Sequence, residues 1–310
     1  MSDNLGSLIA QAATLTDDEI VTRALSRDVL VPQAGGTAVL ITLDNGQDHT
    51  RPNTLGPRSL AELNGAIDGA LARPDICALA ITGKPFIFAA GADLTGVPRI
   101  TERGQAKAIA RIGHAVFNKL HTASVPTFTF INGLALGGGL EIGLHCSYRT
   151  VSSVAPAIAL PECFLGMLPG WGGAYLLPNL IGADHAVTVI IENALNQNKM
   201  LTGPQAFALG IADAMFEGAD FLERSLDWAG RVVAGQITVD RAEIDRGEAW
   251  DAAVARGKAF ADSKVSGAAP APYRALELVA AAKTAERDAA FAAEDEALAD
   301  LIMSPELRAG

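Results

Sequence analysis

Short apolar runs alternate with segments of helical period over the first two thirds of the chain. The runs at residues 37–43 (TAVLITL), 76–82 (ICALAIT) and 126–131 (PTFTFI) are rich in apolar and β-branched residues, which predicts strands. Between them, residues 59–71 and 106–120 carry apolar side chains three and four positions apart, which predicts amphipathic helices. Strands that alternate with helices predict parallel βαβ units with right-handed crossovers.

The two ends of the chain differ from this central region. The first part holds only a weakly amphipathic stretch that ends at proline and glycine residues, so we expect an extension ahead of the main domain. From about residue 240 the chain is rich in Ala and Glu, with helical period on both sides of the breaker GAAPAP at 267–272. An apolar stripe at 273–301 is too long to leave in water. We therefore expect three parts: an N-terminal extension at 1–34, a catalytic core at 35–235, and an all-helical segment at 236–310 that packs on the core.

Composition narrows the class of protein. The 310 residues carry a formal net charge of −11, and 49% of them are hydrophobic, as in a compact globule. The acidic balance argues against binding to nucleic acid or to anionic lipid. No run reaches the ~20 unbroken apolar residues of a membrane span, and the N-terminus lacks the basic start of a signal peptide. We expect a cytoplasmic protein without a membrane span.

The histidines and cysteines indicate neither a metal site nor a disulfide framework. The three cysteines, an odd number, show no CxxC spacing, and the five histidines are scattered without HExxH-like spacing. No GxSxG motif supports a serine nucleophile.

The densest chemical signal is NGLALGGGLE at residues 132–141. Three consecutive glycines lie between a predicted strand and a predicted helix, where the backbone can approach a ligand and free N–H groups favour an anion or an oxyanion. The dinucleotide fingerprint fails because Ile142 stands where its third glycine would be, and no P-loop lysine follows. The glycines alone are equally consistent with a tight turn that binds nothing.

Two glutamates strengthen the case for a catalytic site. Glu141 and Glu162 both lie in apolar sequence surroundings, where desolvation raises the pKa of a carboxyl group toward neutral pH, as general acid–base chemistry requires. The residues themselves leave a catalytic pair and two buried structural glutamates about equally open. The loop FAAGADL at 88–94 follows a predicted strand, where α/β folds place ligands, although a plain strand exit with Asp93 as a helix cap explains it as well.

In this order, FAAGADL, NGLALGGGLE and LPECFLGMLPGWGG resemble the signature of the crotonase (enoyl-CoA hydratase/isomerase) superfamily, from about Thr37 to Met215. PGWGG, LIGADHAV and the C-terminal tail are similar to the hydratase half of the multifunctional fatty-acid oxidation complex α-subunit. There the tail leads into an NAD-dependent 3-hydroxyacyl-CoA dehydrogenase. The resemblance implies an α/β fold, the ClpP/crotonase-like spiral of ββα units, with a C-terminal all-helical segment.

The resemblance also implies an activity and roles for individual residues. The activity is enoyl-CoA hydratase, which adds water syn across the 2,3 double bond of 2-enoyl-CoA thioesters in fatty-acid β-oxidation. Glu141 would deprotonate the water that attacks C3, and Glu162 would deliver a proton to C2. The backbone N–H groups of Ala92 and Gly138 would form the oxyanion hole for the thioester oxygen, and Gly170 would help to position the water or a carboxyl group.

For the CoA portion, the resemblance implies that the Ala90 carbonyl contacts the adenine and that Phe88 and Leu94 line its pocket, although plain packing explains these residues equally well. It implies no separate cofactor, because CoA is part of the substrate. It further implies a homo-oligomer, a trimer or hexamer, and a thiolase partner for full-length α-subunits. The alternatives are a Δ3-Δ2-enoyl-CoA isomerase, which needs only Glu162, and a non-catalytic CoA-binding assembly domain.

Overall fold

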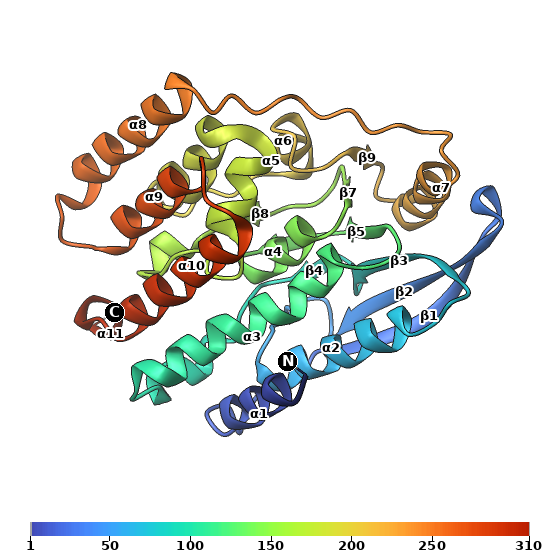
Figure 1. The fold of residues 1–310 in the computed structure, drawn as a ribbon, viewed down its shortest axis with the longest axis horizontal. Helices are drawn as coiled ribbons and strands as arrows, with labels where there is room; N and C mark the ends of the chain where they lie inside the picture. The colour runs from blue at the N-terminus through green and yellow to red at the C-terminus, as the bar shows by residue number, and fades with distance from the viewer. Residues whose placement is uncertain (1, 310) are drawn as a thin grey trace.

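Two sheets form the core of the protein (Figure 1). The structure, a computed structural model, describes residues 2–309, and the side chains of residues 5–307. The larger sheet has the order β1-β2-β3-β5-β7-β9, in which β1 pairs antiparallel with β2 and the other pairs are parallel. Its strands are β1 (Arg23–Val31), β2 (Gly36–Asp44), β3 (Ile76–Gly83), β5 (Thr127–Ile131), β7 (Tyr148–Ser152) and β9 (Ala214–Phe216).

The smaller sheet explains the spiral character of the fold. It has the order β4-β6-β8, all parallel, with β4 (Ile87–Ala89), β6 (Leu134–Leu136) and β8 (Ile158–Ala159). Each of β3, β5 and β7 is followed by one strand of the smaller sheet and then by a helix. The repeating unit is therefore ββα, as the resemblance implied.

The helices of the central region cover these sheets. Buried Leu60, Leu63 and Ile67 give α2 the apolar face that the sequence predicted. The central elements are α2 (Pro57–Leu71), α3 (Arg103–His121), α4 (Gly138–His145), α5 (Gly173–Val187), α6 (Gly203–Ala208), α7 (Phe221–Val233), the 3-10 helices η1 (Pro32–Ala34), η2 (Leu94–Arg99) and η3 (Glu162–Leu165), and the π-helix η4 (Thr188–Glu192). The stretch Gly173–Glu192 is long and apolar enough to cross a membrane, but 61% of its most apolar window is buried inside the protein, as in a core helix.

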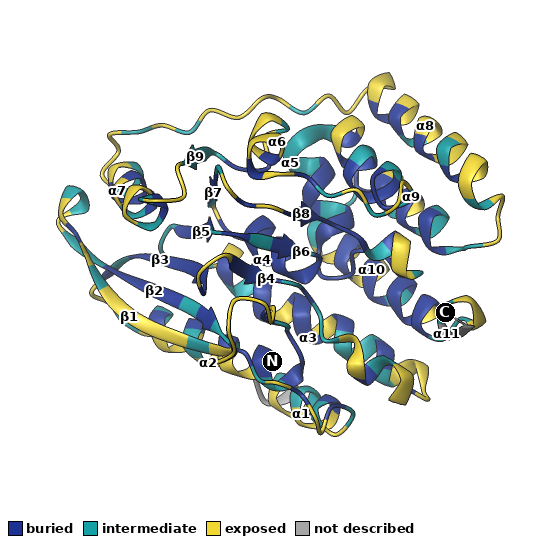
Figure 2. Cartoon of the chain, turned by 180° about the vertical axis from the view of Figure 1, so that it is seen from behind, coloured by how far each residue is buried: buried dark blue, intermediate teal, exposed yellow. Residues whose placement is uncertain are grey.

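The N-terminal region differs from the expected extension. Helix α1 (Ser2–Ala13) packs against α2 and α3, and residues 23–31 form β1, the edge strand of the larger sheet. The main domain therefore includes residues that we expected to precede it. Most of β1 is exposed, as Figure 2 shows, so its sequence lacks the apolar alternation that marks a buried strand.

The C-terminal segment is helical, as predicted, and reaches its place through an extended stretch that crosses the molecule after α7 (Figure 1). It contains α8 (Glu248–Val265), α9 (Ala271–Ala281), α10 (Arg287–Ile302) and α11 (Pro305–Ala309). Two helices, not one, occupy residues 273–301. The last carbonyls of α9 accept hydrogen bonds from side chains of other helices: Val279 from Trp250 at 3.0 Å and Ala282 from Asn179 at 3.2 Å. These donors satisfy the end of α9, and α10 then runs beside α3.

Candidate active site

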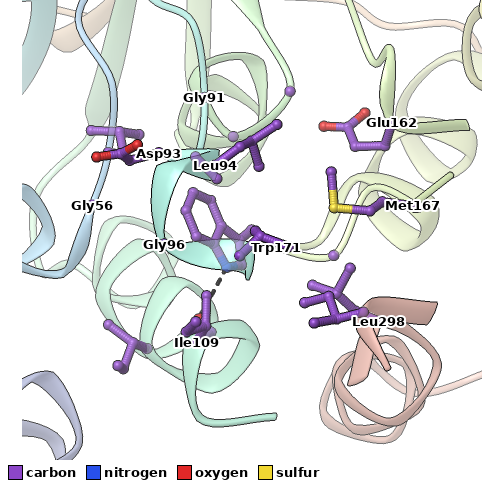
Figure 3. Close-up of a pocket in the computed structure, with 18 of the residues that line it drawn as sticks. Gly56, Gly91, Asp93, Leu94, Gly96, Ile109, Glu162, Met167, Trp171 and Leu298 are labelled. Atoms are coloured by element: carbon purple, nitrogen blue, oxygen red, sulfur yellow. Dashed lines mark hydrogen bonds between the residues drawn. The ribbon is translucent and has the colours of Figure 1, made fainter. Parts of the chain in front are cut away.

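One pocket brings most of the predicted site residues together (Figure 3). It lies where the loop after β4, the start of α4, η3, the loop before α5 and helix α10 meet, and it holds about 970 Å³ of space free of atoms, part of it open to solvent. The predicted residues that line it are Ala90, Ala92, Leu94, Gly138, Glu141, Glu162 and Gly170. Phe88 does not line it, because its side chain is fully buried in the hydrophobic core. Packing therefore accounts for Phe88.

The two predicted oxyanion donors lie in loops that touch each other. Leu55 donates to the Gly91 carbonyl at 2.8 Å and accepts from the Asp93 amide at 3.3 Å, so the intervening Ala92 N–H faces away from Leu55. Gly138 is the first residue of α4, where an N–H has no acceptor within the helix. A Cβ atom on Gly91, whose φ is +88°, would lie 2.9 Å from the Gly138 nitrogen. The absence of a side chain at Gly91 thus permits the loop after β4 to lie close to the start of α4.

Glu141 is held as a carboxylate by two amides. Its side chain is buried in α4, and Oε1 accepts hydrogen bonds from the N–H groups of Trp171 and Gly173, each at 2.8 Å. Burial, and then the nearby charge of Glu294, raise the pKa of Glu141 to about 7, although the hydrogen bonds from the two amides lower it. A carboxylate fixed by two donors, with its pKa near neutral, suits a general base.

Glu162 has different surroundings in the same pocket. Its Oε2 is buried and has no hydrogen-bond partner among the described residues. Its Oε1 lies so close to Gly137 that a Cβ atom there would be 2.4 Å away. Burial, and then the charge of Glu141, raise the pKa of Glu162 well above its ordinary value. At neutral pH this favours a protonated Glu162 beside an ionisable Glu141, the combination that a general acid and a general base require.

The predicted role of Gly170, to help position the water or the second carboxyl group, stays a prediction, and Gly170 is not one of the residues that hold Glu141. Gly170 lines the pocket but packs against Leu298 of α10, where a Cβ atom would lie 2.4 Å from Leu298 Cδ2. The amides of its neighbours Trp171 and Gly173 donate to Glu141. The motif PGWGG marked this loop, but which of its amides face the carboxylate depends on the turn geometry.

The Trp171 indole fills the middle of the pocket and was not anticipated. Its Nε1 donates to the Ile109 carbonyl of α3 at 3.2 Å, and in Figure 3 the ring lies between Leu94 and Ile109. The ring requires glycines on both sides, since a Cβ on Gly113 would lie 2.2 Å from Nε1 and one on Gly138 2.4 Å from Cε3. Trp171 therefore ties α3 to the start of α4.

The second residue that sequence reasoning missed is Glu294 of α10. It is buried and accepts hydrogen bonds from the amides of Gly172 at 2.7 Å and Tyr175 at 2.9 Å, and it pairs with His114 Nε2 at 3.1 Å. The sequence showed only an apolar stripe in this helix, and nothing in the spacing of FAAEDE singles out Glu294. Within the described residues, no group of three or more His, Cys, Asp or Glu side chains could hold a metal ion.

Comparison with known proteins agrees with this geometry. The family model described as enoyl-CoA hydratase/isomerase matches residues 34–244. The fatty acid oxidation complex subunit alpha of Pseudomonas syringae pv. tomato is 30% identical over 252 residues, and that of Pseudomonas putida is 32% identical over 258 residues. These alignments cover 78% and 80% of this chain but 34% and 35% of the relatives. The chain thus spans about a third of the length of these relatives.

Solved structures share the fold. Pseudomonas aeruginosa DspI is 29% identical, with a TM-score of 0.59 over 69% of this chain and 81% of that one. An enoyl-CoA hydratase from Bacillus halodurans, 18% identical, superimposes with a TM-score of 0.62 over 92% of this chain and 97% of that one. The ββα spiral, the glycine loops beside Glu141 and Glu162, and the family match lead to one conclusion: the chain belongs to the enoyl-CoA hydratase/isomerase family.

Proposed function

We propose that this protein is an enoyl-CoA hydratase, which adds water across the 2,3 double bond of 2-enoyl-CoA thioesters. The observation that carries the proposal is the contrast between two buried carboxyl groups in one pocket. Glu141 accepts two backbone hydrogen bonds, whereas Glu162 Oε2 has no partner among the described side chains and backbone groups. Two carboxyls whose surroundings separate their protonation states can serve as a base and an acid.

The reaction follows from the positions of these groups. The N–H groups of Ala92 and Gly138 would bind the thioester oxygen and stabilise the enolate that forms when water attacks C3. Glu141 takes one proton from that water, and the oxygen becomes bonded to C3. Glu162 gives its proton to C2, which removes the enolate charge. The protons balance, since one is taken and one is given, and solvent resets the pair.

The remaining parts of the proposal concern CoA and assembly. Ala90 and Leu94 line the pocket and stay candidates for contacts with the CoA portion. The relatives named fatty acid oxidation complex subunit alpha support a place in fatty-acid β-oxidation. A cytoplasmic location, and a thiolase partner where a full-length complex exists, are further parts of the proposal. We further propose a homo-oligomer, a trimer or hexamer, as the assembled form.

The test is loss of the conjugated enoyl-thioester absorbance with crotonyl-CoA and with longer 2-enoyl-CoAs. We expect turnover by the wild type, and a fall in kcat of about 10²-fold or more for Glu141→Gln and for Glu162→Gln, because each removes one proton transfer. Absence of turnover at every chain length would contradict the proposal. Glutamine variants that lose stability but not rate would favour a non-catalytic CoA-binding domain.

A Δ3-Δ2-enoyl-CoA isomerase is the second candidate, and the unpartnered Oε2 of Glu162 favours it, since this carboxyl group, in its ionised form, could take a proton from C2 and return it to C4. Glu141→Gln separates the two activities. We expect it to abolish hydration and to spare isomerisation of 3-enoyl-CoA. If Glu141→Gln leaves hydration intact, Glu141 is not the base.

A further inference from the structure

The loop that holds Glu141 is itself held from the opposite side by a second buried carboxylate. The amides of Trp171 and Gly173 point to Glu141, while those of Gly172 and Tyr175 point to Glu294, at 2.7 and 2.9 Å. The N–H groups of residues 171, 172 and 173 thus alternate between a carboxylate of α4 and a carboxylate of α10, and that of Tyr175 adds a second bond to the latter. The position of one set of amides depends on the position of the other, because the peptides are adjacent.

Glu294 is held in position by a buried cluster of charged side chains. His114 of α3 contacts Glu294 through Nε2 at 3.1 Å and Asp295 through Nδ1 at 2.8 Å, and its ring stacks on Phe291. Burial lowers the pKa of His114, but its hydrogen bonds to Asp295 and Glu294 outweigh this and raise the pKa to about 9. Burial raises the pKa of Glu294, whereas His114 and the two loop amides act in the opposite direction. A protonated His114 donates from both nitrogens, so the oxygens of Glu294 meet only donors, which favours the ionised form.

The loop has a third attachment, at its carbonyl side. Burial lowers the pKa of His145 well below its ordinary value, so the ring is neutral. Nε2 then donates to the Trp171 carbonyl at 2.9 Å, while Nδ1 accepts from Arg287 at 3.0 Å. Gly172, with a φ of +108°, leaves no room for a Cβ, which would lie 2.7 Å from His145 Nε2. A loop of glycines has little rigidity of its own, so these side chains determine its shape.

We propose that Glu294 is a positioning residue: by binding the amides of Gly172 and Tyr175, it fixes the orientation in which the amides of Trp171 and Gly173 hold the general base Glu141. The inference rests on the proposed function for the role of Glu141. The C-terminal helices thereby become part of the active-site machinery, although Glu294 does not touch the reacting atoms.

The charge of Glu294 also gives the proposal a pH signature. The titratable groups that face Glu141 are Glu162 of η3, Glu294 of α10 and His114 of α3, and after burial the Glu294 charge raises the pKa of Glu141 the most, whereas His114 lowers it less. Glu294 itself faces His114 and Glu141 and shares its helix with Arg287 and Asp295. Removal of the Glu294 charge should therefore lower the pKa of Glu141, even if His114 also loses its proton.

The experiment compares Glu294→Gln with the matched control Asp295→Asn. Both variants remove one partner of His114, but only Glu294→Gln places an amide NH₂ group against the loop N–H donors. For Glu294→Gln we expect kcat for enoyl-CoA hydration to fall about 10- to 100-fold, with KM changed less than about threefold. We also expect the acidic limb of the kcat profile to move to lower pH. Asp295→Asn should keep kcat within about threefold and leave the acidic limb in place.

Hydrogen exchange of the peptide that covers residues 167–177 supplies a readout that is independent of the substrate. In Glu294→Gln these amides should exchange faster by about tenfold or more, and in Asp295→Asn they should exchange as in the wild type. Unchanged exchange in a folded Glu294→Gln overturns the proposal, as does an unchanged kcat or acidic limb. A wild type that hydrates no enoyl-CoA refutes the proposed function alone, and the exchange data still decide whether Glu294 holds the loop.

A further variant covers the case in which Glu294→Gln does not fold. His114→Gln keeps the Glu294 carboxylate on the loop but removes the positive charge of His114. Because that charge lowers the pKa of Glu141, its removal should raise the pKa of Glu141. The acidic limb should then move in the opposite direction, to higher pH, with the exchange of residues 167–177 close to that of the wild type. A limb that does not move, or moves to lower pH, contradicts the electrostatic part of the proposal.

Discussion

Individual glycines bring the groups that line the pocket together, because they leave out a side chain where two elements meet. A Cβ on Gly138 would lie 2.4 Å from the Trp171 ring, and one on Gly139 would lie 2.2 Å from the Ala89 carbonyl oxygen. Contacts this short force a neighbour to move, and neither a backbone carbonyl nor a wedged indole moves easily. The three glycines at 137–139 are thus explained by packing around the pocket as well as by access to a backbone donor.

At this scale we predict that Gly138→Ala lowers kcat for hydration by about 10²-fold, because the added methyl displaces Trp171, whose own amide holds Glu141, and shifts a proposed oxyanion donor. The control is Gly143→Ala in the same helix, where the nearest atom to a Cβ, Thr129 Cγ2, is 3.5 Å away. Gly143→Ala should keep kcat and raise the free energy of unfolding by up to about 1 kcal/mol. Steady-state rates and denaturant unfolding of both variants check this, and equal rates would contradict the crowding argument.

The residues show what sequence could and could not locate. Glu141 and Glu162 were found because a carboxyl in an apolar segment is unusual, and the pocket does bring them together. Glu294 was missed because it lies in a helix with many acidic residues, where only the fold shows that this one is buried. Trp171 belongs to the PGWGG motif, but its packing against Gly113 is a contact between distant segments, which no local sequence pattern predicts.

Among the elements, length decided which could be predicted. The strands β2, β3 and β5 and the helices α2 and α3 are long enough to show a period, and the structure contains all five. The strands of the smaller sheet have two or three residues each, too few for any alternation. Sequence analysis therefore described βαβ units, and only the family resemblance supplied the second strand of each ββα unit.

The end of helix α1 gives a prediction at the scale of elements. Leu15 follows α1 and lines the pocket, as Thr16 and Ile109 also do. We expect Leu15→Ala to enlarge the pocket at this wall. The ratio of kcat/KM for a C10 over a C4 2-enoyl-CoA should then rise by about fourfold or more, because each further buried methylene group contributes about 0.8 kcal/mol.

The matched control for this wall is Leu8→Ala. Leu8 lies in the same N-terminal region and packs on the core, but it does not line the pocket. It should lower stability without changing the chain-length ratio. If the two variants give the same ratio, Leu15 does not bound the acyl site, and the first residues serve the fold alone.

Over the whole molecule, the C-terminal helices close the fold around the pocket. Helix α10 places Leu298 and Ile302 in the pocket wall, and Arg103 of α3 pairs with its Glu296 and Asp300 at 2.6 and 2.7 Å. These exposed ion pairs contribute little to stability, so buried apolar side chains and the Glu294 cluster account for most of the attachment. The sequence predicted that the apolar stripe at residues 273–301 packs on the core, but only the fold shows that α3 is the partner of α10.

The last prediction concerns removal of this helix. A chain that ends at residue 286 loses the buried side chains of Phe291, Leu298, Leu301 and Ile302, each of which contributes about 1.5–3 kcal/mol of transfer free energy. Their sum, roughly 6–12 kcal/mol, is comparable to the whole free energy of unfolding of a typical domain. We therefore expect this chain to be insoluble or unfolded by circular dichroism. A chain that ends at residue 304 loses only α11 and should keep its fold and its hydratase rate. A folded, active chain ending at residue 286 would show that α10 is an accessory of the site, because the core then holds its two glutamates without it.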